Sequence, residues 1–308
     1  MVGQLDAPRL YQAAAVAARN VPASVSRGAA AAGGSIGSLF AGDRRVIVER
    51  NLERAGVPLR SDSDRRRAVA RCLAHYGRYY ADSFRLPSLS REIVDGQFRH
   101  NGFEHITEPL ERGEGAILVL PHLGGWEWAG FWLAIQHQFR VTSIVEAIEP
   151  PELFEWFKSL RESLGMTITS VGPEAGPVIL DSIKSNSIVC LLSDRTVGDT
   201  SSVPVEFFGE RTLLPAGPAT IALRTGAPLL PTAVYFDGPD HFAECRPAVP
   251  AVREGKFRDD VQRITQALAD ELELLIRAAP EQWHVLQPIW PSDYRALGRP
   301  VPEKMRGL

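Results

Sequence analysis

Apolar residues follow two different rhythms along the 308-residue chain. Up to about residue 95 they recur at steps of three and four, most regularly over 62–86, and this spacing predicts amphipathic helices. Asp62 or Asp64 is a suitable N-cap for the helix over 62–86. From residue 116 onward, short runs of consecutive apolar residues alternate with helical segments. The chain is therefore predicted to be helical first and to alternate between strands and helices afterwards.

The apolar runs after residue 116 indicate a largely parallel sheet. Strands that are buried on both faces carry continuous apolar residues, and strands that alternate with helices form βαβ units. Two consecutive strands within 227–249 predict an antiparallel edge. The other predicted strands are 116–120, 141–148, 166–172 and 187–194, and the predicted helices are 126–139, 150–165, 175–185, 215–226 and 258–279.

These patterns predict one α/β domain with a mixed, mainly parallel central sheet flanked by helices. Residues 1–95 are expected to form a helical N-terminal extension, and residues 96–308 the α/β core. A hydrophobic fraction of 44% and a charged fraction of 23% are typical of a soluble globular protein. The three cysteines lie far apart without metal-ligand spacing, so we expect no disulfide framework and no metal site, and a reducing setting. They are Cys72, Cys190 and Cys245.

The charge of the chain is unevenly distributed. Residues 1–85 hold fourteen arginines, no lysine and seven acidic residues, a net charge of +7, whereas the whole chain carries −3. A basic, alanine-rich helical segment suggests contact with an anionic membrane surface, although a solvated helical face would have the same composition. The arginines belong to no recognisable reader module, so nucleic acid is not an expected partner. The apolar stretch over 10–42 is interrupted by Arg19, Pro22 and Arg27, which favours short helices over a membrane span.

The clearest chemical signal lies in the stretch AILVLPHLGGWEWAG, residues 116–130. Pro121 stops the ladder of a buried strand, and Gly124 and Gly125 turn the chain into the next helix. In open parallel sheets, ligands bind outside the carboxyl ends of the strands, which is where His122 falls. Glu127, in the first turn of the helix, is expected to approach His122 across the glycine turn.

An imidazole beside a carboxylate is suited to taking a proton from a hydroxyl group. No serine or cysteine with nucleophile signals stands next to His122, so the substrate's own hydroxyl is expected to attack. The other histidines lack this setting and are predicted to be surface or packed residues. They are His75, His100, His105, His137, His241 and His284.

The motif H-x4-E, His122 to Glu127, resembles the signature of the H-x4-D/E glycerolipid acyltransferase superfamily. The segments FRHNGFEHI, LLSDRT, VPVEFFGERTLLPAGPA and WHVLQPIW resemble the lipid A late acyltransferases and, most of all, the actinobacterial phosphatidylinositol mannoside acyltransferases. The resemblance extends over about 60–295. It implies an acyltransferase fold and transfer of a long-chain acyl group, such as palmitoyl, from acyl-CoA to a hydroxyl of a membrane glycolipid, such as the mannose 6-OH. It also implies a peripheral protein at the cytoplasmic face of the plasma membrane, with no metal and no cofactor besides the acyl-CoA co-substrate.

The resemblance also implies roles for individual residues. His122 would be the general base, Glu127 the acid of the motif, and Glu206 the partner of His122 in a charge relay. Asp194 and Glu210 remain open as alternatives for that partner. Arg161 would neutralise a CoA phosphate or the developing oxyanion, unless it is an ordinary helix-surface arginine. The remaining predicted substrate-binding residues are Glu146, Gly124, Gly125, Asp194 and Arg195.

Other functions are less well supported by the sequence. GGSIG, residues 33–37, matches the G-x-S-x-G motif of hydrolases, but the residues before it make a poor strand, which a nucleophile elbow requires. A non-catalytic lipid-binding protein on the same fold would not need His122 and Glu127. The acceptor is also open, since another glycolipid or a lysophospholipid would use the same chemistry.

Overall fold

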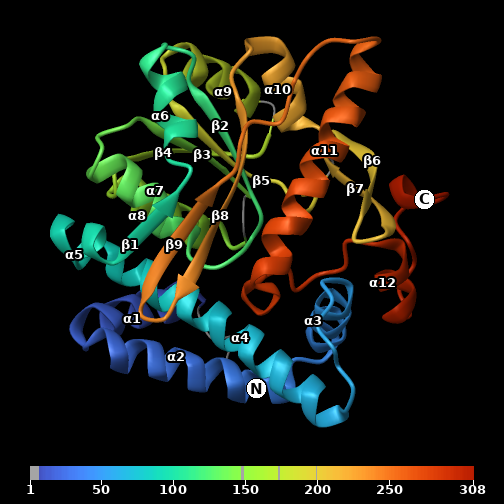
Figure 1. Ribbon diagram of the computed structural model, residues 1–308. Coiled ribbons are helices and arrows are strands. Elements are labelled where there is room, and N and C mark those ends of the chain that lie inside the picture. The colour runs from blue at the N-terminus through green and yellow to red at the C-terminus, as the bar shows by residue number, and fades with distance from the viewer. Residues whose placement is uncertain (1–6, 147–148, 173, 199) are drawn as a thin grey trace.

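A computed structural model describes residues 7–146, 149–172, 174–198 and 200–308 (Figure 1). Its strands are β1 (Phe98–Asn101), β2 (Ala116–Leu120), β3 (Val141–Val145), β4 (Met166–Ser170), β5 (Ile188–Leu192), β6 (Ser202–Phe207), β7 (Glu210–Pro215), β8 (Leu229–Asp237) and β9 (Asp240–Cys245). Its longer helices are α1 (Ala7–Asn20), α2 (Ala23–Gly37), α3 (Asp43–Arg54), α4 (Asp62–Arg85), α6 (Glu104–Glu111), α7 (Trp126–Ile135), α8 (Pro151–Glu162), α9 (Ala175–Lys184), α10 (Gly217–Thr225) and α11 (Phe257–Ala278). The short helices are α5 (Arg91–Gly96), α12 (Pro291–Ala296) and the 3₁₀ turns η1 (Ser38–Phe40), η2 (Leu86–Ser88), η3 (Pro280–Gln282) and η4 (Glu303–Met305).

Seven strands form the central sheet in the order β1-β9-β8-β2-β5-β3-β4. β8, β2, β5, β3 and β4 run parallel to one another, and β9 pairs antiparallel with β8. The predicted mixed, mainly parallel sheet is therefore confirmed. The expected antiparallel edge is wrong in one respect, because β1 pairs parallel with β9 and lies outside it.

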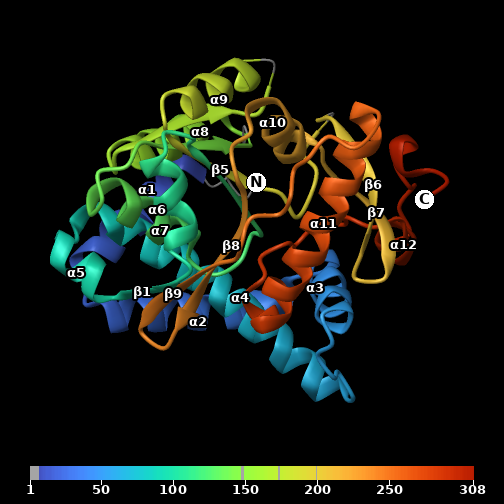
Figure 2. The same cartoon turned by 45° about the horizontal axis from the view of Figure 1, so that its top comes forward.

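Strand β2 shows why the sheet is covered on both faces. All five of its residues are buried, and successive side chains point to opposite sides. Ile117 and Val119 pack with residues of α9, α10 and α11, whereas Leu118 and Leu120 pack with residues of α6 and α7. Both views show α7 and α11 on opposite sides of β8 (Figures 1 and 2). Burying each such side chain contributes roughly 1.5–3 kcal/mol.

The N-terminal helices form a layer below the sheet in Figure 1. Ser61, rather than either predicted aspartate, caps α4 by accepting a hydrogen bond from the backbone N–H of Asp64. Helix α2 packs very closely on α4. A Cβ atom at Gly34 would lie 2.2 Å from the carbonyl oxygen of Leu73, and one at Gly77 would lie 2.6 Å from that of Ala30. These two glycines allow the close approach of the helices.

Several sequence expectations need adjustment. The antiparallel hairpin of β6 and β7 is absent from the predicted strands, because Pro204 and Glu206 interrupt its apolar residues. Its signal was the alternation of Val203, Val205 and Phe207, which are all buried. The predicted strand 141–148 ends at Val145, and residues 147–148 lie outside the described residues. GGSIG lies inside α2, so the strand–turn–helix of a nucleophile elbow is not formed there.

Candidate active site

The loop after β2 holds His122 at the carboxyl edge of the sheet. Gly124 has a φ of +59°, and a Cβ atom there would lie 2.0 Å from the carbonyl oxygen of Val234. A Cβ atom at Gly125 would lie 2.6 Å from Cδ2 of His241. The two glycines therefore let the loop press against β8 and β9. The structure thus gives both glycines a packing role, and the substrate contact predicted for them stays a prediction.

The acid beside His122 is Asp194, one of the alternatives left open by the sequence. Nδ1 of His122 lies 2.5 Å from Oδ1 of Asp194, and the backbone N–H of His122 donates to Oδ2 at 2.9 Å. Trp283 donates its indole N–H to the same Oδ2 at 2.7 Å. Asp194 is fully buried, and both of its oxygens contact His122 or Trp283, so the structure makes it the partner of His122.

Sheet register explains how residues 72 positions apart meet. Leu120 on β2 pairs with Leu192 on the neighbouring parallel strand β5. His122 and Asp194 each follow two residues later, so they emerge side by side at the same edge.

The negative charge of Asp194 selects the tautomer of the His122 ring. Burial alone would raise the pKa of Asp194, but attraction to His122 and the hydrogen bonds from His122 and Trp283 outweigh burial and lower it. The ionised carboxylate holds the imidazole proton on Nδ1 and leaves Nε2 as the acceptor of the ring. The His122 side chain is 16% exposed and lines a cleft, so a substrate can reach it.

Glu127 does not orient His122 as predicted. Its carboxylate binds Arg161 of α8, with Nη2 at 2.5 Å and Nε at 2.9 Å from Oε1, and it accepts a hydrogen bond from the hydroxyl of Tyr79 at 2.9 Å. Burial lowers the pKa of Arg161, but the charge of Glu127 outweighs burial and raises it above its usual value. Arg161 is thus a largely buried, permanently charged group, 17% exposed, and not a helix-surface arginine.

The glutamates of the β6–β7 hairpin do not pair with His122. Glu206 is exposed, and its backbone N–H and carbonyl both bond to the side chain of Gln266 on α11. Glu210 binds Arg54 at 3.0 Å and Ser292. The predicted relay through Glu206 is not formed in this structure, because the hairpin backbone at Glu206 bonds to α11 and the Glu210 side chain bonds to Arg54 and Ser292.

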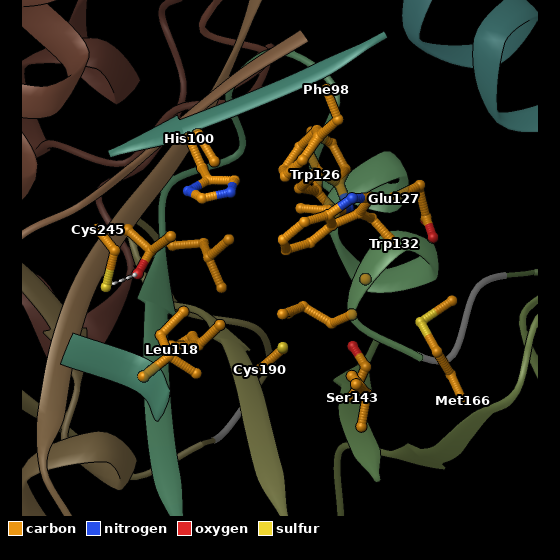
Figure 3. Close-up of a pocket in the computed structure, with 18 of the residues that line it drawn as sticks. Phe98, His100, Leu118, Trp126, Glu127, Trp132, Ser143, Met166, Cys190 and Cys245 are labelled. Atoms are coloured by element: carbon orange, nitrogen blue, oxygen red, sulfur yellow. Dashed lines mark hydrogen bonds between the residues drawn. The ribbon is translucent and has the colours of Figure 1, made fainter. Parts of the chain in front are cut away.

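An apolar cavity lies between α7 and the sheet (Figure 3). The cavity is partly open to solvent. Phe98, His100 and Trp132 line it on one side, and Leu118, Cys190 and Met166 on others (Figure 3).

The cavity adjoins the cleft that holds His122. Arg161 and Trp126 line both spaces, together with Val145 and Leu192. Glu146 and Arg195, which form an ion pair at 2.6 Å, line the cleft as well. An imidazole acceptor, a buried cation and a deep apolar space therefore meet at one place.

Sequence reasoning missed several residues of the cleft. Tyr76, Tyr79 and Tyr80 of α4 line it, as does His284, which had been predicted to be an ordinary packed histidine. Trp283 and His284 belong to the segment WHVLQPIW. The resemblance of this segment to the acyltransferases was the only signal in the sequence that pointed to them. The backbone N–H of His284 donates to the carbonyl of His122 at 2.7 Å, which fastens this segment to the loop.

The site thus combines a mixed sheet, a histidine–carboxylate pair in a cleft and an apolar cavity beside that cleft. The family model for bacterial lipid A biosynthesis acyltransferases matches residues 7–292, so the chain belongs to this family and is an acyltransferase. It is 36% identical to the phosphatidylinositol mannoside acyltransferase of Mycobacterium tuberculosis (strain CDC 1551 / Oshkosh), over 92% of this chain and 88% of that protein.

Two further relatives are similar to the chain. The phosphatidylinositol mannoside acyltransferase of Mycolicibacterium smegmatis is 35% identical over 89% of this chain and 88% of its own length. The lipid A biosynthesis acyltransferase of Haemophilus influenzae is 25% identical over 59% of this chain and 55% of its own length.

Proposed function

We propose that the protein transfers a long-chain acyl group, palmitoyl in the first instance, from acyl-CoA to a phosphatidylinositol mannoside. The observation that carries the proposal is the His122–Asp194 pair in a cleft that adjoins a deep apolar cavity. The names of two of the relatives support the mannoside as the acceptor. Among its hydroxyls we propose the primary 6-OH of a mannose.

His122 is the general base in this mechanism. Its Nε2 takes the proton from the mannose hydroxyl as the oxygen attacks the thioester carbonyl carbon, and Asp194 stabilises the imidazolium that forms. The tetrahedral intermediate then collapses, the C–S bond breaks, and the proton on Nε2 passes to the leaving thiolate of CoA. These steps balance without a redox group, so we propose no cofactor besides the acyl-CoA co-substrate.

Arg161 supports the same reaction from the opening of the cavity. It lines both the cleft and the cavity, so a thioester whose acyl chain fills the cavity would present its carbonyl close to the guanidinium. A fixed positive charge in a partly dry site stabilises the oxyanion of the intermediate. Glu127 and Tyr79 hold Arg161 in place for this role.

The N-terminal helices are the proposed membrane contact, at the cytoplasmic face. Six large apolar side chains within 7–40 are more than half exposed, and such a group in a segment of net positive charge, +7 over residues 1–85, fits an anionic lipid surface. They are Leu10, Val16, Val25, Ile36, Leu39 and Phe40. No helix within the described ranges is long and apolar enough to cross a bilayer.

The test is a mass-spectrometric acylation assay. The purified protein is incubated with palmitoyl-CoA and a panel of phosphatidylinositol mannosides, lipid A precursors and lysophospholipids, beside His122→Ala. Acylation of a mannoside by the wild type alone supports both the acceptor and the base. Acylation of another lipid would overturn the acceptor, and release of CoA without an acylated lipid would indicate a thioesterase. Binding of acyl-CoA without any turnover would favour the lipid-carrier alternative.

A further inference from the structure

We propose that Gly130 and Met166 set the length of the acyl chain that the enzyme accepts. This inference rests on the proposed function, in which the acyl chain occupies the apolar cavity. It concerns the deep end of the cavity and assigns specificity to two residues that have no part in the chemical step.

The register of the sheet gives the direction and depth of the cavity. Val145 and Leu192 line it next to the cleft. One layer deeper are Ser143 and Cys190, which pair with each other. Val141 is a further layer down, four residues from Val145, which corresponds to a depth of about 13 Å at 3.3 Å per residue.

Met166 belongs to this deepest layer. It begins strand β4, pairs with Val141, and contributes its side chain to the cavity wall. Helix α7 forms the facing wall, with Glu127 near the cleft, then Gly130, then Leu133. The deep end toward β4 is thus lined by Val141, Leu133 and Met166, which are all apolar.

The other side of the cavity suits a hydrocarbon tail less well. Toward β1 and β9 the wall includes the polar side chains of His100, Asn101 and Thr232. Asn101 already bonds to Glu244, and Thr232 to the carbonyl of Leu230. The cost therefore falls on the ring of His100, which would lose hydrogen bonds to water against an alkyl chain. We therefore expect the tail to run toward Met166.

Gly130 makes helix α7 less stable than alanine would, and the space that its missing side chain leaves explains why a glycine stands there. A glycine within a helix is roughly 0.5–1 kcal/mol less favourable than alanine, yet Gly130 lies in the middle of α7. A Cβ atom at this position would lie 2.9 Å from Sδ of Met166 and 3.9 Å from its Cε. The glycine therefore gives the methionine room on the helix side. Because methionine is unbranched and flexible, an added methyl group would push its side chain into the cavity.

The experiment compares Gly130→Ala and Met166→Ala with the wild type on decanoyl-, dodecanoyl-, tetradecanoyl-, palmitoyl- and stearoyl-CoA. Gly130→Ala should lower kcat/KM for the longest accepted chain relative to dodecanoyl by about tenfold, the low end of what one methylene is worth in an apolar pocket. Met166→Ala should shift the profile toward longer chains. Gly176→Ala, a helical glycine with open space around its Cβ position, is the matched control and should leave the profile unchanged.

Binding provides a second readout that does not depend on turnover. Trp126 and Trp132 line the cavity, so quenching of tryptophan fluorescence on titration with each acyl-CoA gives a Kd. If both variants keep the wild-type length profile in turnover and in Kd, the inference is wrong. If the wild type binds but does not transfer, the proposed function fails while the Kd profiles still test the length inference. If Gly130→Ala does not fold, Met166→Ala carries the test alone.

Discussion

The described part of the chain contains two histidine–aspartate pairs in very different surroundings. His122 and Asp194 lie 2.5 Å apart at the edge of a cleft, and the histidine is partly exposed. His241 and Asp82 lie 3.5 Å apart, with side-chain exposures of 0% and 4%. Asp82 also binds Arg27 at 2.7 Å and Arg78 at 3.0 Å. The two pairs use the same residue types, but only one is open to a substrate.

The His241–Asp82 pair packs against the loop that carries His122. His241 stacks on Trp128 with ring centroids 4.2 Å apart, and its edge faces Gly125 of the loop that carries His122. Burial lowers the pKa of His241, so its ring is neutral near pH 7, and the two arginines balance the charge of Asp82. The comparison shows that access and unshared charge distinguish a reactive pair from one that ties helices to a sheet.

Removing the imidazole of His122, which belongs to the accessible pair, should give the largest effect on activity. His122→Ala should lower kcat by about 10²–10⁴-fold, because general base catalysis supplies that factor. Its free energy of unfolding should stay close to that of the wild type, since the ring is partly exposed. Steady-state acylation and urea denaturation measure the two quantities. Near wild-type turnover by the variant would remove His122 from the mechanism.

Breaking the buried His241–Asp82 pair should lower the free energy of unfolding instead of the activity. Asp82→Ala leaves the partly buried Arg27 and Arg78 without their carboxylate, and such a loss costs at most roughly 3–5 kcal/mol, the value for a fully buried pair. Urea denaturation should show this loss, while kcat per folded molecule should fall much less than in His122→Ala. The distinction between the two pairs would collapse if Asp82→Ala kept full stability and lost its activity.

Exchanging single carboxylates tests which acid serves His122. Asp194→Asn should lower kcat by about 10²-fold, because an amide cannot stabilise the imidazolium or hold the same tautomer. Glu206→Gln is the matched control on the exposed hairpin and should change kcat by less than about twofold. The opposite ranking of the two variants would restore the relay through Glu206.

Lowering the pH should gradually remove the stability that the His241–Asp82 pair contributes. Burial raises the pKa of Asp82, but attraction to His241 and to Arg27 outweighs burial and lowers it to about 2. A depressed pKa contributes stability above the unfolded value of 3.8, and this contribution is lost as the pH falls toward 2. The lost stability should be about 2 kcal/mol. Urea midpoints from pH 6 to pH 2 should fall less steeply in Asp82→Asn, and identical slopes would contradict the assignment.

The sequence could locate half of the reactive pair. The apolar run 116–120 and the proline after it identified His122 as a strand-end residue, and the structure confirms that position. Asp194 was harder, because sequence alone does not reveal which strands are neighbours. Once β2 and β5 are known to pair with Leu120 opposite Leu192, the partner follows from counting.

Glu127 shows a different limit of sequence reasoning. Its place in the first turn of α7 was predicted correctly, but a helix position fixes the backbone and not the direction of a long side chain. The actual partners, Arg161 and Tyr79, come from α8 and α4. Only the packing of three helices selects that direction.

The contact between α2 and α4 has a consequence for inheritance. Any replacement of glycine adds at least one carbon, and at Gly34 and Gly77 that carbon would fall 2.2 Å and 2.6 Å from a backbone oxygen. Every nonsynonymous change in either codon should therefore be selected against. The contact between α2 and α4 should thus hold two of the least mutable positions in the gene, although the alanine-rich composition of α2 suggests a segment under little constraint.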